Sequence, residues 1–145
     1  MATPDHLLGG TDGTVLFGLD FLKILLQRPG RSDASIIAVC AHEFGHIVSY
    51  KNDMISTLAP NHQEPFRAEQ FADYMAGFYA GRRKLVHSDF PAASFASTQY
   101  AFGGGDHGTN KQRGDAVQQG YFAAYRDHKT LDEATQSALA YCMNE

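Results

Sequence analysis

The pattern of apolar residues indicates a strand first and helices afterwards. A turn-rich cluster at residues 9–13 precedes a β-rich run at 14–17, which predicts a strand entered from a turn. The simplest arrangement is a hairpin whose first strand is residues 6–8. From residue 20 to 27 the apolar positions follow helical spacing, and the Pro-Gly pair at 29–30 is expected to end that helix.

The next helix is expected to be apolar on nearly every side. Ser32 and Asp33 are good N-cap residues, and residues 34–50 carry apolar side chains along two stripes of a helix. Such a helix is predicted to lie buried inside the domain. Its polar side chains need partners, because an unpaired buried polar group costs about 1–3 kcal/mol. These polar residues are therefore the first candidates for function.

Further helices are expected along the rest of the chain. A polar loop at residues 52–64 leads to a helix at 66–80, which Gly81 is expected to end. Start signals for three more helices are Asp89 with Pro91, Thr109 with Gln112, and Thr130 with Glu133. The helix after Thr109 is expected to reach about residue 127. The predicted fold class is α+β: one helix-rich domain, residues 1–145, with a small β-sheet or hairpin at the N-terminus.

Composition narrows the classes of function. The chain has 145 residues, enough for one domain with a core, and a net charge of −4 without a basic stripe, so binding of nucleic acid has little support. No apolar run approaches the length that spans a bilayer, and the first residues lack the pattern of a signal peptide. The cysteines, Cys40 and Cys142, form no metal motif and are expected to be free thiols. Compartment and oligomeric state stay open.

The chemistry is concentrated in an H-E-x-x-H pattern at residues 42–46 of the apolar helix. His42 and His46 are four residues apart and lie on one helical face, so both imidazoles can reach one ion. Glu43 lies slightly to the side, where a general base for a metal-bound water is needed. The alternative is that both histidines are core residues bonded to backbone carbonyls.

A second polar pair, Glu69 and Asp73, is also four apart on the next helix. A catalytic zinc site needs three protein ligands and an open position. Glu69 is suited to be the third ligand beside His42 and His46. Asp73, one turn later, is suited to accept the free N–H of a ligand histidine and so fix its orientation. The alternative is two solvated carboxylates on an exposed face.

Together these residues carry a resemblance to a known family. The pattern His42-Glu43-x-x-His46 followed by Glu69-x-x-Ala72-Asp73 resembles the gluzincin metallopeptidases, in particular the bacterial neutral zinc metallopeptidases. Residues 106–113 are similar to a D-x-H-G-T-x-x-Q-R stretch of that family, with one residue fewer before the histidine. The resemblance implies a zincin-like fold, a bound Zn²⁺ and a position for His107 near the metal.

The sequence therefore predicts a zinc-dependent peptidase acting on a peptide or protein substrate. His42, His46 and Glu69 are the expected metal ligands, and Glu43 is the expected general base. His107 is expected to stabilise the oxyanion, although a loop histidine without a catalytic role is the alternative. An edge strand near residues 15–17 is expected to pair with an extended peptide.

Two other functions stay open. One is a catalytically inactive zinc-containing domain that only binds peptide or protein; the intact Glu43 argues against it, because a structural zinc site needs no base. The other is a different metallohydrolase such as a peptide deformylase. Deformylases use a cysteine as third ligand, and both cysteines are badly placed for that role.

Overall fold

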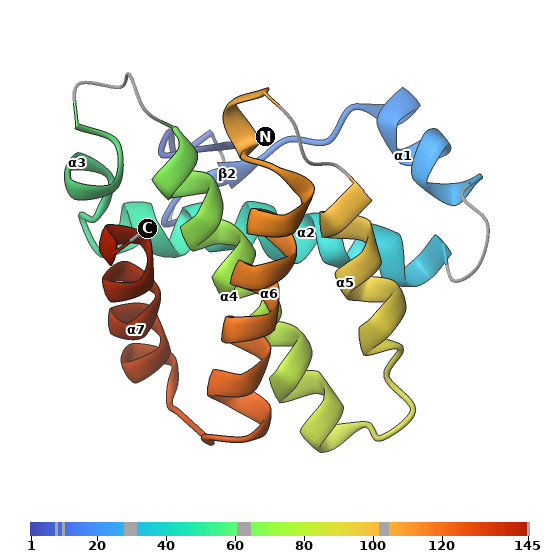
Figure 1. The fold of residues 1–145 in the computed structure, drawn as a ribbon. Helices are drawn as coiled ribbons and strands as arrows, with labels where there is room; N and C mark the ends of the chain where they lie inside the picture. Colours follow the sequence, from blue (N-terminus) through green and yellow to red (C-terminus); the bar gives the residue numbers. More distant parts are fainter. Residues whose placement is uncertain (8, 10, 28–31, 61–64, 102–104, 145) are drawn as a thin grey trace.

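The fold is helix-rich α+β, with a small antiparallel sheet at the N-terminus, as the sequence predicts. The computed structural model describes residues 1–7, 9, 11–27, 32–60, 65–101 and 105–144 (Figure 1). The predicted helix end at residues 29–30 lies outside these residues. In chain order the elements are β1 (Ala2–Thr3), β2 (Thr14–Val15), α1 (Leu19–Leu26), α2 (Ser32–Lys51), α3 (Ile55–Leu58), α4 (Phe66–Val86), α5 (Ala92–Ala101), the 3₁₀ turn η2 (Gly105–His107), α6 (Asn110–Tyr125) and α7 (Leu131–Asn144).

The hairpin forms from a different first strand than the one predicted. β2 pairs with β1, with Ala2 opposite Val15 and Thr3 opposite Thr14, and not with residues 6–8, of which residue 8 lies outside the description. The Thr14 hydroxyl explains the difference. It donates to the Asp5 carbonyl at 2.8 Å and accepts from the Leu7 amide at 3.2 Å, so residues 5–7 are held as a loop.

Helix α4 lies at the centre of the structure and packs against α2, α5, α6 and α7 (Figure 1). Its approach to α6 is very close, because a Cβ on Gly77 would overlap the Val117 carbonyl and one on Gly120 would overlap the Tyr74 carbonyl. The two helices therefore touch through their backbones at glycine positions. Side chains elsewhere on α4 fill the core, with Phe71 fully buried.

Gly81 does not end this helix, contrary to the prediction from sequence, and α4 continues to Val86. A Cβ at Gly81 would lie 2.6 Å from the Tyr121 carbonyl oxygen and 2.8 Å from the Ala124 Cβ. The glycine thus serves the contact with α6. A stop signal and a close-packing position look the same in sequence, because both use the smallest residue.

Other predicted helix boundaries agree with the structure, although two details differ. The capping boxes at Thr109 and Thr130 are present, and α6 ends at Tyr125 rather than near residue 127. The segment 52–64 contains the short helix α3, whose Leu58 is fully buried in the core. Within the described residues, no helix is both long and apolar enough to cross a membrane.

Helix α2 is buried on one side only, which corrects the expectation of an all-round buried helix. Ala34, Ala38, His42 and Ser49 are buried, but Phe44 is 59% exposed. The second apolar stripe of α2 therefore lines an open groove, although Ile37 and Val48 within it also pack against the core.

We expect Gly120→Ala to destabilise the protein, because the new methyl group would meet the backbone of α4 and neither helix can move without disturbing the other contacts. The expected cost is at least about 1–3 kcal/mol, or a loss of about 5 °C or more in Tm. Thermal unfolding followed by circular dichroism measures it. Gly9→Ala is the matched control, since nothing lies within 4 Å of a Cβ at Gly9. Equal Tm values for the two variants would contradict the proposed close contact.

Candidate metal centre

Two histidines of α2 and one glutamate of α4 converge on one point. His42 Nε2 lies 3.1 Å from Glu69 Oε2, and His46 Nε2 lies 3.4 Å from Glu69 Oε1. The two Nε2 atoms are 3.3 Å apart. One donor atom from each residue lies within 4.8 Å of the others, a spacing that allows all three to bind a single ion.

Small residues of α2 and α4 make this convergence possible. A Cβ on Gly45 would lie 2.7 Å from the Ala72 Cα, so the two backbones cross with almost no side chain between them. Gly45 directly precedes His46, and Ala72 lies about one turn after Glu69. The close crossing therefore places Glu69 across from both imidazoles. The glycine of the H-E-x-x-H helix and the alanine between Glu69 and Asp73 together form this contact.

Asp73 sets the orientation of His42 on the side of the imidazole that faces away from Glu69. His42 Nδ1 lies 2.8 Å from Asp73 Oδ1, and Asp73 is fully buried. A hydrogen bond donated by Nδ1 leaves Nε2 directed at Glu69 and His46. Support of a ligand histidine by a carboxylate is common in zinc sites, where it fixes the tautomer and raises the basicity of the ring.

Arg113 completes this buried network, and the sequence analysis did not assign it a role. Its Nε donates to Asp73 Oδ2 at 2.7 Å and its Nη2 donates to Asp73 Oδ1 at 2.8 Å. Such a two-pronged arrangement holds a carboxylate in a fixed plane. Arg113 is the last residue of the stretch 106–113 that was singled out, so the motif contained the signal. Its partner could not be read from sequence because the contact joins α6 to α4.

The buried charges shift the ionisation of the ligands. Burial by itself would lower the pKa of His42, but hydrogen bonds and charges from Asp73 and Glu69 outweigh it and raise the pKa to about 9. Burial would likewise raise the pKa of Glu69, yet the bonds to His42 and His46 hold it far below its usual range. Without a metal, His42 therefore carries a proton at neutral pH. A metal cation would replace that proton.

His107 and Glu43 approach the centre from two other elements. His107 Nδ1, on η2, lies 2.7 Å from Glu69 Oε2, and its side chain is 53% exposed. Glu43 follows His42 on α2 but pairs with the amino group of Met1 on the neighbouring strand, at 2.9 Å. All six residues that the sequence nominated thus lie around one centre. Five are joined by direct contacts, and Glu43 lies beside them facing β1.

Tyr50 is a further aromatic neighbour that the sequence analysis did not single out. Its ring stacks on His46 with centroids 6.5 Å apart, and its hydroxyl donates to the Ala2 carbonyl at 3.5 Å. Burial and the charges of Glu43 and Glu69 raise the pKa of the Tyr50 hydroxyl. The sequence did indicate this contact, because Tyr50 lies four residues after His46 on the same helix.

The chain matches no protein-family model, no curated protein and no solved structure. The resemblance to gluzincins therefore stays a prediction that rests on the motifs. What the structure adds is the convergence of those motifs in space.

Glu69→Ala is expected to remove most of the bound metal, because only two ligands would remain. Mass spectrometry of metal content, on protein purified without added metal, should give about one ion per chain for the wild type and far less for the variant. Asp115→Ala, which changes an exposed acidic residue of α6, should leave the metal content unchanged. Equal metal in wild type and Glu69→Ala would exclude Glu69 as a ligand.

In the metal-free protein, stability is expected to fall as pH rises. His42 has a folded pKa of about 9, above its ordinary 6.5, so its contribution is complete below pH 6.5 and is lost as pH passes 9. Thermal unfolding between pH 6 and 9.5, with a chelator present, should show a drop of several degrees. His42→Gln should flatten this drop. A gain in the stability of the wild type over that pH range would contradict this prediction for His42.

Proposed function

We propose that the protein is a zinc-dependent peptidase, in which His42, His46 and Glu69 would hold the metal and Glu43 is the general base. The observation that carries the proposal is the convergence of these three donors beside a glutamate on the same helix. A pure metal-storage or structural site has no need for that glutamate. The proposal also places the chain with the gluzincin metallopeptidases.

The donor set fits zinc. Two imidazole nitrogens and one carboxylate oxygen match the composition of catalytic zinc sites, which keep one position open for water. The bonded Asp73 behind His42 is the expected support for such a ligand. When bound, zinc would act as a Lewis acid and lower the pKa of a coordinated water toward roughly 7.

Glu43 is proposed to transfer the proton. Its side chain is only 15% exposed, and it extends from α2 toward β1. As a base it would take a proton from the attacking water on a carboxylate oxygen and then deliver it to the leaving amine.

His107 is proposed to assist the oxyanion. Its Nδ1 would stay beside Glu69 Oε2 while Nε2 faces a substrate oxygen. Its exposure leaves room for that contact.

The outer edge of β1, where the Ala2 carbonyl accepts from the Tyr50 hydroxyl at 3.5 Å, supports binding of an extended peptide. Met1 and Leu16 exchange two hydrogen bonds, at 2.9 and 3.0 Å. Because such pairs alternate along an antiparallel ladder, the N–H and C=O of Ala2 point away from β2. Val15, opposite Ala2, directs its N–H and C=O away from β1 in the same way, so the predicted edge at residues 15–17 and the outer edge of β1 are both proposed substrate edges, and Met1, directly before β1, is paired with Glu43. Main-chain pairing of this kind suits a peptide or protein substrate and carries little side-chain specificity.

A second candidate is a catalytically inactive zinc domain that binds peptide. The contact between His107 Nδ1 and Glu69 Oε2 favours it, because a small movement would make His107 a fourth protein ligand. X-ray absorption of the zinc-loaded protein distinguishes the two functions by the number of histidine ligands. A deformylase-like site has no support, since Cys142 is buried in the core and Cys40 lies on the far side of α2.

Glu43→Gln is expected to keep the metal and to lower peptide hydrolysis by about 10²- to 10⁴-fold, because the amide cannot accept the proton. Cleavage of casein or a quenched fluorescent peptide library gives the rate, and metal analysis of the same samples gives the occupancy. Asp115→Ala serves as the control for effects of purification and storage on the activity. Wild-type rates in Glu43→Gln would refute the mechanism, and no hydrolysis by zinc-loaded wild type would favour the inactive domain.

A further inference from the structure

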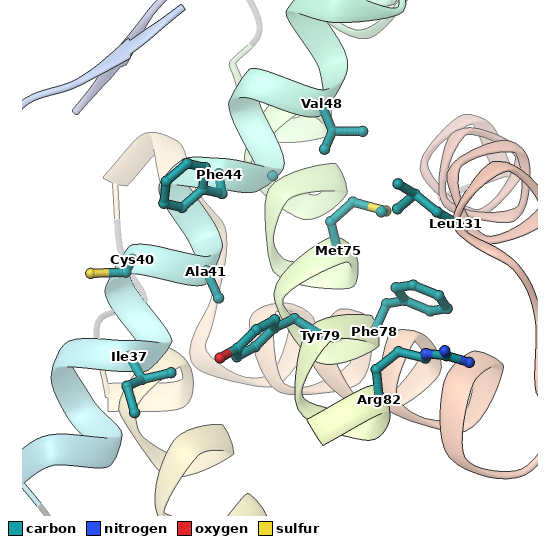
Figure 2. Close-up of a pocket in the computed structure, with 11 residues that line it drawn as sticks. Ile37, Cys40, Ala41, Phe44, Val48, Met75, Phe78, Tyr79, Arg82 and Leu131 are labelled. Atoms are coloured by element: carbon teal, nitrogen blue, oxygen red, sulfur yellow. The ribbon is translucent and has the colours of Figure 1, made fainter. Parts of the chain in front are cut away.

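A second feature lies on the opposite side of α2 from the metal centre. It is a groove of about 470 Å³ between α2 and α4, closed at one side by Leu131 at the start of α7 (Figure 2). Phe44 lies on its rim, two residues from His42 and about 200° around the helix. None of the six residues of the metal centre lines the groove. It is therefore separate from the site of the proposed peptidase.

The lining of this groove is apolar but open to solvent. Phe44 is 59% exposed and Leu131 is 54% exposed, and Tyr79 is also exposed. The groove follows α2 from Ile37 to Val48, a length of about 16 Å at 1.5 Å per residue. Both its volume and its apolar lining are those of small-molecule sites. Its elongated form suits an unbranched chain.

Among the described residues, Arg82 is the charged residue that lines the groove. Arg82 is exposed and makes no hydrogen bond or ion pair with the described residues. Its neighbour Lys84 differs, because it donates to the carbonyls of Ser88 and Phe90. Arg82 is thus a cation available to a ligand at the edge of an apolar surface, in a chain whose net charge is −4.

We propose that this groove binds an anionic amphiphile, a molecule with an unbranched aliphatic chain and an acidic head group. The chain would lie along the apolar side chains between α2 and α4, and the head group would pair with Arg82. Apolar burial supplies most of the affinity, and the charge selects acids over amines of the same chain. This inference does not depend on the proposed peptidase activity.

The experiment is a calorimetric titration of the whole chain with dodecanoate and, separately, with dodecyltrimethylammonium, both below their micelle concentrations. Dodecanoate should bind with one site per chain, and the cation should bind more weakly. Arg82→Gln should weaken dodecanoate by about two- to five-fold, as expected for one partly exposed ion pair. Arg83→Gln is the matched control, because Arg83 is the adjacent exposed arginine and does not line the groove.

Cys40 reports the place of binding. Cys40 is one of the residues that line the groove and is partly exposed, whereas Cys142 is fully buried in the core. Burial, followed by the charge of Glu43, raises the pKa of the Cys40 thiol, so labelling with N-ethylmaleimide is best done at mildly alkaline pH. Dodecanoate should slow the labelling of Cys40 in proportion to the occupancy measured by calorimetry.

Three results would overturn the proposal. The first is the absence of saturable binding of dodecanoate. The second is binding that leaves Cys40 labelling unchanged or that Arg82→Gln and Arg83→Gln weaken equally. The third is self-association of the ligand-free protein that Phe44→Asp abolishes in sedimentation, because the groove would then be an interface between two copies of the chain.

Discussion

The close approach of α4 to both α2 and α6 is the constraint on which the rest of the structure depends. Gly45 faces Ala72 on one side, and Gly77 and Gly120 face backbone carbonyls on the other. Each contact lacks side-chain bulk, so the helices meet at their backbones. Only at this separation can Glu69 of α4 reach the imidazoles of α2, and only then can Arg113 of α6 reach Asp73. The arrangement of the residues at the centre therefore depends on the positions of the glycines and of Ala72, which allow the helices to approach closely.

The polar cluster is stable because positively and negatively charged groups alternate along it. Arg113 neutralises Asp73, Asp73 supports His42, and His42 faces Glu69. A buried carboxylate without its cation would be costly, and losing one partner of such a pair is more damaging than losing both. The series ends at the mouth of the cluster, where a proton on His42 or a metal cation balances Glu69. A cation is thus required at this place in either state.

Helical periodicity explains why the site could be predicted better than parts of the fold. Residues four apart share a face, which sufficed to pair His42 with His46 and Glu69 with Asp73. Capping boxes at Thr109 and Thr130 are equally local, and they too were predictable. The first strand was not, because the Thr14 hydroxyl that holds residues 5–7 in a loop acts across a turn. The role of Arg113 was missed and Gly81 was wrongly predicted to end its helix for the same reason, since the contact of each residue is with a helix far away in sequence.

The open side of α2 also follows from the use of small residues. Gly45 lets α2 and α4 come together beside the metal centre, yet it also lines the groove on the other face, as does Ala41. A pair of helices that meets through small residues has little side-chain volume left to fill the space beside the contact. The larger side chains of the same stripe, Phe44 and Val48, flank that space instead of closing it. The apolar pattern that predicted a fully buried helix therefore reflects two separate demands: a core on one face, and on the other an apolar surface that solvent reaches.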